Sequence, residues 1–392
     1  MDNFKIAPIP ELIFGTGTVE GLSDIIRKKD YSNIVIITGG NSFISSSYWL
    51  KLKQLLTESE IKYDHYQSVG EASPETVDGI VSNLKDKRTD VIVAIGGGTV
   101  MDTGKAVSAM LCMDGSIVDY LEGVGSKQPT GKRKPLICIP TTSGTGSEAT
   151  KNAVITKIGK DGYKKSLRHE GYIPDTVIID PDLIKSCPLS LTVASGMDAV
   201  TQLLESYVST KSTPFTDLLA LYGLKLAGRS LPKLVENGDN IEARADMAYA
   251  AYLSGITLAN AGLGVVHGAA SVLGAFRSIP HGVVCGTLLG SATEVIIKKI
   301  NNSKKPENWE SLKKFAEAGT ALTGILNNNV EQGCNILIKT LNNWVTNYGV
   351  SRLSEYGFTE KDLLDSTKMI GLKNTPCELD SKELLSILIT RL

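Results

Sequence analysis

The chain changes character once along its length, and this change limits its possible folds more than any other feature. Before residue 182, short β-rich runs alternate with amphipathic helical stretches, whereas after about Pro188 apolar residues recur at helical spacing and β-branched runs nearly vanish. The predicted strands are 33–38, 61–66, 90–96, 134–140, 152–157 and 176–181, with helical patterns near 19–28, 45–57, 74–86 and 99–112. Apolar strands such as VIVAI that alternate with helices indicate a parallel sheet covered on both faces. We therefore expect an α/β domain over 1–184 and an all-helical domain of seven or more helices over 185–392.

Composition and charge narrow the functional classes. The 392 residues suffice for two domains, and the formal net charge of −1 offers no electrostatic reason to bind nucleic acid or an anionic membrane. The six cysteines are dispersed without a CxxC pair, which is typical of a reduced intracellular protein. The N-terminus does not resemble a signal peptide and no apolar run reaches transmembrane length, so we expect a cytoplasmic protein.

Four potential metal ligands lie in the helical half. Two of the four histidines, His267 and His281, stand fourteen residues apart in one glycine-rich segment. Upstream, Asp198 and Gln202 are four residues apart in a helical pattern, so their side chains leave the same helix face. Two imidazoles, a carboxylate and an amide oxygen form a mixed donor set that suits Zn(II) or Fe(II). The sequence therefore predicts a site for one divalent metal ion, if these groups converge.

A glycine-rich loop, AIGGGTVMDTGK, leads from the apolar strand 90–96 into a helix. Its three glycines let backbone N–H groups approach an anion closely, and the helix N-terminus adds a favourable dipole. A pyrophosphate fits this loop, with Asp102 in the first helical turn and Lys105 one turn further along. The pattern differs from the usual GxGxxG fingerprint of dinucleotide-binding proteins. The alternative is a tight strand-to-helix turn that binds nothing.

A second loop, PTTSGTGSEAT at 140–150, contains six hydroxyl side chains. An ordinary turn does not need that many hydrogen-bond donors, whereas a ligand with several oxygens, such as a dinucleotide, does. The alternative is a solvated Ser/Thr loop.

The residues after strand 33–38 bear on the choice of coenzyme. NAD-binding domains usually place an acid after such a strand to hold the ribose 2′-hydroxyl. Here Gly39, Gly40, Asn41 and Ser42 supply no acid, and small polar groups accept a 2′-phosphate. We therefore expect NADP(H) to be favoured over NAD(H).

Together these motifs resemble the iron-containing (group III) alcohol dehydrogenase family over essentially the whole chain. The matching pieces are FGTG at 14–17, GGGTVMDTGK at 96–105, PTTSGTGSE at 140–148, GMDA at 196–199 and the segment from Asn260 to His281. The resemblance implies a dehydroquinate synthase-like architecture, in which the active site lies in a cleft between the α/β and helical domains. It also implies reversible NAD(P)-dependent interconversion of a small alcohol with an aldehyde or ketone, in a homodimer or higher homo-oligomer.

The resemblance assigns roles to individual positions. Asp198, His267 and His281 match three of the family's four metal ligands, and Lys164 matches a lysine near the nicotinamide ribose. The cofactor positions that match are Gly39, Gly97, Gly98 and Thr99, together with the hydroxyl-bearing Thr141, Thr142, Thr145 and Ser147.

Two positions depart from the family pattern. Gln202 stands where the family has a histidine ligand, which leaves open a looser metal site, a site with three protein ligands, or a lost metal. Glycerol dehydrogenases, which are distant relatives, manage with one aspartate and two histidines. Ser271 stands where many members have a histidine that relays a proton, so the proton route passes to water, a ribose hydroxyl or another side chain.

The expected function is a metal-dependent, NAD(P)-linked alcohol dehydrogenase or aldehyde reductase. In such an enzyme the metal acts as a Lewis acid on the substrate oxygen while hydride passes between substrate carbon and nicotinamide C4. One alternative is a dehydroquinate synthase-like lyase, which needs several basic residues around an anionic substrate; the helical half shows few near its metal motif apart from Arg277. The other is a metal-free nucleotide-binding member. The sequence does not specify the substrate.

Overall fold

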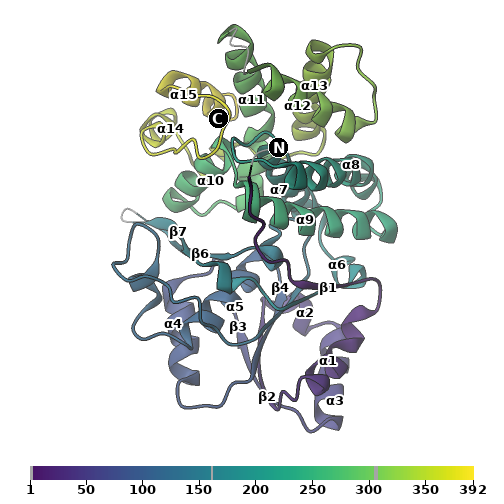
Figure 1. Ribbon diagram of the computed structural model, residues 1–392, viewed down its shortest axis with the longest axis vertical. Coiled ribbons are helices and arrows are strands. Elements are labelled where there is room, and N and C mark those ends of the chain that lie inside the picture. The colour runs from purple at the N-terminus through teal and green to yellow at the C-terminus, as the bar shows by residue number, and fades with distance from the viewer. Residues whose placement is uncertain (1–2, 160–161, 304–307) are drawn as a thin grey trace.

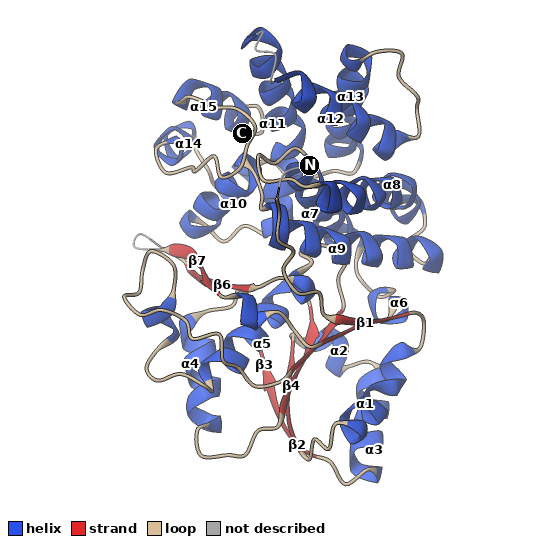
Figure 2. Cartoon of the chain, in the orientation of Figure 1, coloured by secondary structure: helices blue, strands red, loops and turns tan. Residues whose placement is uncertain are grey.

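The computed structural model describes residues 3–159, 162–303 and 308–392. The α/β part forms the lower half of the molecule in Figure 1 and the helical part the upper half. The strands belong to the N-terminal half of the chain, and the described part of the chain after the last strand is built from helices and loops (Figure 2). This arrangement confirms the predicted fold class.

The core of the α/β half is a six-stranded parallel sheet with the strand order β1-β8-β5-β4-β2-β3. Its strands are β1 Glu11–Phe14, β2 Asn33–Thr38, β3 Lys62–Gln67, β4 Val91–Gly96, β5 Leu136–Pro140 and β8 Thr176–Ile179. Every residue of β4 and of β5 is buried, as expected for central strands with helices on both faces. One face packs on α1 Leu22–Lys28, α2 Asn41–Ile44 and α3 Ser47–Glu58, and the other on α4 Pro74–Leu84 and α5 Gly98–Met110.

Two strands lie outside this sheet. The predicted strand 152–157 forms, as β6 Asn152–Lys157, but it pairs antiparallel with β7 Tyr163–Arg168 in a separate two-stranded sheet, which corrects the expectation of one parallel sheet. Sequence reasoning missed β7 because its sequence, YKKSLR, is polar, and β1 because it is only four residues long at the sheet edge.

The helical half begins after β8, and the predicted domain boundary falls between the short helix α6 and the long helix α7. Its helices are α6 Pro181–Ile184, α7 Leu189–Tyr207, α8 Pro214–Glu236, α9 Ile241–Ala261, α10 Val265–Phe276, α11 His281–Ser303, α12 Asn308–Thr323, α13 Val330–Asn347, α14 Glu360–Thr367 and α15 Ser381–Ile389. Short 3-10 turns occur at Thr18–Gly21, Ile117–Tyr120, Ser147–Ala149, Glu170–Tyr172 and Leu353–Tyr356. Helix α7 is central, because every residue from 196 to 207 is buried among α8, α9 and α11.

Within the described residues, no single helix combines the length and hydropathy needed to span a membrane. The pair α9 and α10 passes that test only when taken together, and the two helices meet at a bend of 99°.

Candidate metal and cofactor site

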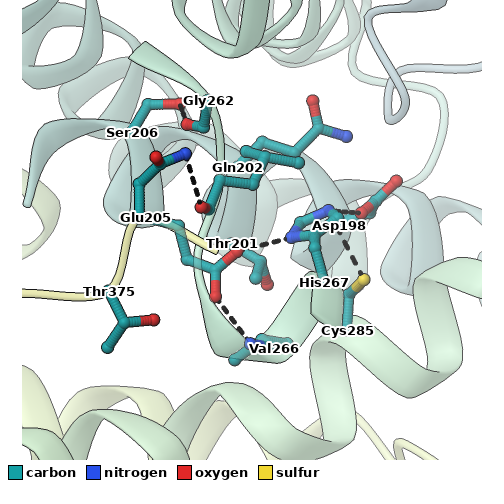
Figure 3. A network of polar contacts seen from close by, with 12 residues as sticks. Asp198, Thr201, Gln202, Glu205, Ser206, Gly262, Val266, His267, Cys285 and Thr375 are labelled. Atoms are coloured by element: carbon teal, nitrogen blue, oxygen red, sulfur yellow. Dashed lines mark hydrogen bonds and ion pairs between the residues drawn. The ribbon is translucent and has the colours of Figure 1, made fainter. Parts of the chain in front are cut away.

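Four side chains from three helices converge in the helical half. They are Asp198 on α7, His267 on α10, and His281 and Cys285 on α11, and their potential ligand atoms all lie within 4.8 Å of one another. Asp198 Oδ1 lies 3.3 Å from Nε2 of His267 and 3.8 Å from Nε2 of His281. Cys285 Sγ lies 3.7 Å and 3.6 Å from the same two nitrogens. Figure 3 shows Asp198, His267 and Cys285 facing one another.

The cluster fits a divalent cation. Asp198 is only 1% exposed, yet neither of its carboxylate oxygens accepts a hydrogen bond from the residues that the structure describes. Nδ1 of the partly buried His281 is likewise without a hydrogen-bond partner among those residues. Burying a carboxylate that accepts no hydrogen bond is expensive, and a bound cation offsets that cost. Carboxylate, imidazole and thiol groups are all ordinary ligands of zinc-like metals.

A buried carboxylate orients His267 from the side opposite the cluster. Glu205 on α7 places Oε2 2.7 Å from His267 Nδ1, and its Oε1 accepts a 2.7 Å hydrogen bond from the N–H of Val266 (Figure 3). With Nδ1–H donating to Glu205, Nε2 of His267 faces the cluster, as in carboxylate–histidine–metal arrangements.

Sequence reasoning missed both Glu205 and Cys285. A signal for each was present, because Glu205 follows Asp198 by seven residues and Cys285 follows His281 by four, which are same-face spacings on a helix.

Burial and mutual charge shift the pKa values in the cluster. Burial opposes ionisation of Asp198, but the neighbouring His281 and His267 outweigh it and hold the pKa of Asp198 at about 2. Burial lowers the pKa of His281 to about 4 and raises the pKa of the Cys285 thiol to about 12. Burial would also lower the pKa of His267, but Cys285, Asp198 and Glu205 together raise it well above its usual range.

The two departures from the family pattern both lie near this cluster. Gln202 is 2% exposed; its Oε1 lies 3.0 Å from the hydroxyl of Ser254, and its Nε2 lies 3.5 Å from the carbonyl oxygen of Gly144. Ligation of a metal by Gln202 stays a prediction. The hydroxyl of Ser271 donates a 2.8 Å hydrogen bond to the carbonyl oxygen of His267, within its own helix.

The predicted cofactor loops meet at one edge of the parallel sheet. Thr38 at the end of β2 is in register with Ile95 of β4, and Gly96 is in register with Pro140 of β5, so the loops at 39–42, 96–99 and 140–148 leave the same edge. From β2 the chain continues to β3 on one side, and from β4 to β5 on the other. This reversal between neighbouring strands is the place where open α/β sheets bind dinucleotides.

The glycines of this edge permit a close approach between loops. A Cβ atom on Gly98 would lie 2.6 Å from the side chain of Thr145, so only glycine fits there without a shift of its neighbours. Gly97 is the N-cap of α5, and the side chain of Thr142 lies 3.3 Å from where a Cβ of Gly97 would stand. The loops therefore present backbone N–H groups at a helix N-terminus, which suits a pyrophosphate.

The polar side chains predicted for the cofactor differ in what they contact. The hydroxyl of Thr99 donates to the carbonyl oxygen of Gly70 at 2.9 Å. Ser147 is 5% exposed and donates to Asp102 at 2.5 Å, so these two side chains bond each other and brace the loop. The other side chains predicted to contact the cofactor are accessible to solvent. Thr141, Thr142 and Thr145 are partly exposed, and Asn41 and Ser42 are exposed.

Lys164 comes from the α/β half, and its side chain lies against α10 of the helical half. It lies on β7, its Nζ donates a 2.9 Å bond to Glu71 Oε2, and its side chain is 8% exposed. Its stem lies against Gly274 of α10, and the charges of both Lys164 and Glu71 influence His281. Lys164 of the β6–β7 hairpin and Glu71, from the segment between β3 and α4, therefore form a charged pair near enough to His281 to affect its pKa.

Comparisons with known proteins cover both halves of the chain. Residues 10–181 match the family model "Iron-containing alcohol dehydrogenase", and residues 192–390 match "Fe-containing alcohol dehydrogenase family, C-terminal". The chain is 36% identical over 294 residues to alcohol dehydrogenase 4 of Saccharomyces cerevisiae, covering 74% of this chain and 75% of that protein. It is 35% identical over 289 residues to the NAD-dependent methanol dehydrogenase of Bacillus methanolicus, covering 72% and 73%.

Solved structures show the same fold over the full length. A 1,3-propanediol oxidoreductase superposes with a TM-score of 0.88 at 25% identity and covers 100% of both chains. A sulfoacetaldehyde reductase from Bifidobacterium kashiwanohense in complex with NAD+ superposes with a TM-score of 0.83 at 25% identity, over 100% of this chain and 99% of that one.

Proposed function

Because this chain belongs to the iron-containing alcohol dehydrogenase family and is an oxidoreductase acting on CH–OH groups, we propose that it interconverts a small alcohol and its aldehyde with NADP(H) preferred over NAD(H). The observation that supports this best is the cluster of Asp198, His267, His281 and Cys285, whose potential ligand atoms lie within 4.8 Å of one another. A divalent metal and a nicotinamide coenzyme are what family membership implies.

The preference for NADP(H) rests on the loop after β2. Gly39, Asn41 and Ser42 carry no negative charge that would repel a 2′-phosphate. The names of two similar proteins mention NAD, the other coenzyme. Activity with NADPH and with NADH is therefore measured side by side for this chain.

In the proposed site, the helical half holds the metal and the α/β half holds the coenzyme. When bound, a divalent cation supplies Lewis acidity to the substrate oxygen, and the coenzyme carries the hydride. Asp198, His267 and His281 would hold the cation, while Glu205 fixes the ring of His267. Lys164, which Glu71 holds at 2.9 Å, would orient the nicotinamide ribose.

Further properties are proposed from the family resemblance, the net charge and the cysteines. The family resemblance supports a homodimer or higher homo-oligomer and iron as the metal, with Zn(II) as the alternative. The near-zero net charge supports small molecules, and neither nucleic acid nor a membrane, as binding partners. The dispersed cysteines, none of them in a disulfide, support a cytoplasmic location.

The test is NADPH- and NADH-linked reduction of a panel of aldehydes by the wild type and by Asp198→Ala and His281→Ala. Both variants should lose about 100-fold or more of the wild-type activity, since losing a ligand costs at least as much as losing a group that orients one. His169→Asn is the matched control, because His169 accepts a hydrogen bond from the N–H of Gly171 in the other half and asparagine keeps such a cap.

Activity close to wild type in both Asp198→Ala and His281→Ala would contradict the metal assignment. The metal content of protein purified without chelator, and its activity after addition of Fe(II) or Zn(II), distinguish a metal-dependent enzyme from the metal-free nucleotide-binding alternative. A lyase of the dehydroquinate synthase type would show no steady NADPH consumption with any aldehyde.

A further inference from the structure

We propose that Cys285 is the fourth protein ligand of the metal, in place of the histidine that Gln202 replaces, and that the resulting site prefers Zn(II) to Fe(II). This inference rests on the metal dependence proposed above, and it adds a donor atom and a metal preference to it.

The distances within the cluster match those expected around one tetrahedral ion. With metal–sulfur bonds of about 2.3 Å and metal–nitrogen or metal–oxygen bonds of about 2.0–2.1 Å, sulfur and nitrogen ligands lie about 3.6 Å apart, and nitrogen and oxygen about 3.3–3.4 Å apart. The observed separations from Cys285 Sγ to the two Nε2 atoms are 3.7 Å and 3.6 Å. Asp198 Oδ1 lies 3.3 Å from His267 Nε2 and, slightly further, 3.8 Å from His281 Nε2.

Two arrangements fit these sulfur contacts. In metal-free protein, the thiol accepts a hydrogen bond from one ring N–H and donates to the nitrogen of the other ring. With a metal bound, Sγ and both Nε2 atoms surround one ion at the same separations, and spectroscopy of the metal-loaded protein distinguishes the two.

The local structure holds Cys285 in place for this role. His281 and Cys285 are four residues apart on α11, so their side chains leave the same face of the helix. Cys285 is 0% exposed, so its thiol faces the buried cluster and has no contact with solvent. Nε2 of His267 already faces the same space, because Nδ1 of that ring is held by Glu205.

Gln202 is the competing candidate, and its amide has contacts elsewhere. Its Oε1 lies 3.0 Å from the hydroxyl of Ser254, and its Nε2 lies 3.5 Å from the carbonyl oxygen of Gly144. A neutral amide oxygen is also a weaker donor than a thiolate toward zinc-like metals. These contacts leave the fourth position to Cys285.

A thiolate ligand changes which metal the site prefers. Soft sulfur donors favour Zn(II), whereas oxygen donors suit harder cations. The thiol proton passes to solvent when the metal binds, since a coordinating thiol is deprotonated. Zinc accepts a fifth ligand during catalysis, so four protein ligands leave a position for the substrate oxygen.

The first experiment uses the wild-type protein loaded with Zn(II) and requires no variant. X-ray absorption at the zinc edge should show one sulfur at about 2.3 Å together with nitrogen and oxygen at about 2.0–2.1 Å. The Co(II)-loaded protein should show the near-ultraviolet charge-transfer absorption of a thiolate–cobalt bond. A zinc shell of nitrogen and oxygen alone would overturn the inference.

The second experiment compares variants by metal affinity, measured in competition with a chromophoric chelator. Cys285→Ala should lose the cobalt charge-transfer absorption and weaken Zn(II) binding about 10-fold or more, while Cys285→Ser, which keeps the volume, should lose the same absorption. Gln202→Ala should keep it. The matched control is Cys334→Ala, because Cys334 is also buried in the helical half but its thiol donates to the carbonyl oxygen of Leu312.

The outcomes distinguish this inference from the proposed function. Metal binding without a sulfur signal, or loss of affinity in Gln202→Ala but not in Cys285→Ala, overturns the role of Cys285 alone and leaves the metal dependence intact. A wild-type protein that binds neither Zn(II), Co(II) nor Fe(II) overturns both. A preference for Fe(II) in competition with Zn(II), despite a sulfur signal, overturns the metal preference.

Discussion

Two buried charged side chains, one from each half of the molecule, have opposite surroundings. In the α/β half, Lys105 is 0% exposed, and its Nζ lies 2.8 Å from the carbonyl oxygen of Ser147, 2.8 Å from the hydroxyl of Thr150 and 3.1 Å from Asp102. In the helical half, the carboxylate oxygens of Asp198 accept no hydrogen bond from the described residues. A satisfied buried charge stabilises the fold, whereas an unsatisfied one indicates a place kept for a ligand.

The halves also differ in what they offer to a ligand. The α/β half presents backbone N–H groups of glycine loops, and the buried Lys105 stabilises the loop at 140–150 through its contacts with Ser147 and Thr150. The helical half presents buried side chains directly. Substitutions in the first half should therefore affect stability and coenzyme choice, and those in the second should affect metal binding.

The largest expected effect tests the contrast between Lys105 and Asp198. Lys105→Met should lower the free energy of unfolding by about 3–5 kcal/mol, because it leaves Asp102 and two loop carbonyls without their cation. Asp198→Asn in metal-free protein should lower it by less, about 2 kcal/mol, because, despite burial, His281 and His267 stabilise the ionised carboxylate and hold its pKa at about 2. Chemical denaturation in the presence of a chelator measures both.

A surface lysine provides the control for this pair. Lys5→Met removes an exposed ion pair with Glu170 and should change the free energy of unfolding by less than about 1 kcal/mol. Equal losses in Lys105→Met and Asp198→Asn would remove the distinction between the two halves.

The next effect concerns pH and the buried Glu148 of the α/β half. Burial raises the pKa of Glu148 from 4.5 to about 7, so the folded state binds this proton more tightly than the unfolded state. The stabilisation is complete below about pH 4.5 and is lost as the pH rises to about 7, a change of about 3 kcal/mol. Glu148→Gln should remove this part of the pH dependence, as measured by denaturation midpoints across that range. An unchanged pH profile in Glu148→Gln would show that Glu148 is ionised in the folded protein.

A smaller effect tests the orientation of His267 in the helical half. Glu205→Gln should weaken metal binding about 10- to 100-fold, since partners of ligating histidines contribute about that much. Chelator competition measures it, and Glu236→Gln, at the exposed end of α8, is the control. Unchanged affinity in Glu205→Gln would mean that the packing of α10 alone positions the ring.

The smallest effect concerns coenzyme choice in the α/β half. A Cβ atom on Gly39 would lie 3.7 Å from Val100, an ordinary contact, so Gly39→Asp should fold normally. The new carboxylate should shift the ratio of kcat/KM for NADP+ and NAD+ about 10-fold toward NAD+, which is about 1.4 kcal/mol. Gly79→Asp in α4, where a Cβ meets nothing within 4 Å, adds the same charge away from the loop. If the ratio of kcat/KM for the two coenzymes changes equally in both variants, Gly39 does not determine the coenzyme preference.

Local patterns in the sequence were enough to predict most of the fold. Apolar runs such as those of β4 and β5 are buried on both faces, and alternation with helices then requires a parallel sheet. These patterns did not predict the pairing of β6 with β7, because an antiparallel hairpin with a polar second strand has little apolar periodicity.

Local periodicity and short motifs predict the fold class, the glycine loops and three groups of the proposed metal site, Asp198, His267 and His281. The packing of the helices shows in addition that Cys285 completes their cluster and that Glu205 orients His267, and the loop packing shows that Ser147 and Asp102 bond each other. Helical spacing shows which side chains share a face but not what that face meets. The meeting of α7, α10 and α11 depends on the packing of the whole helical core.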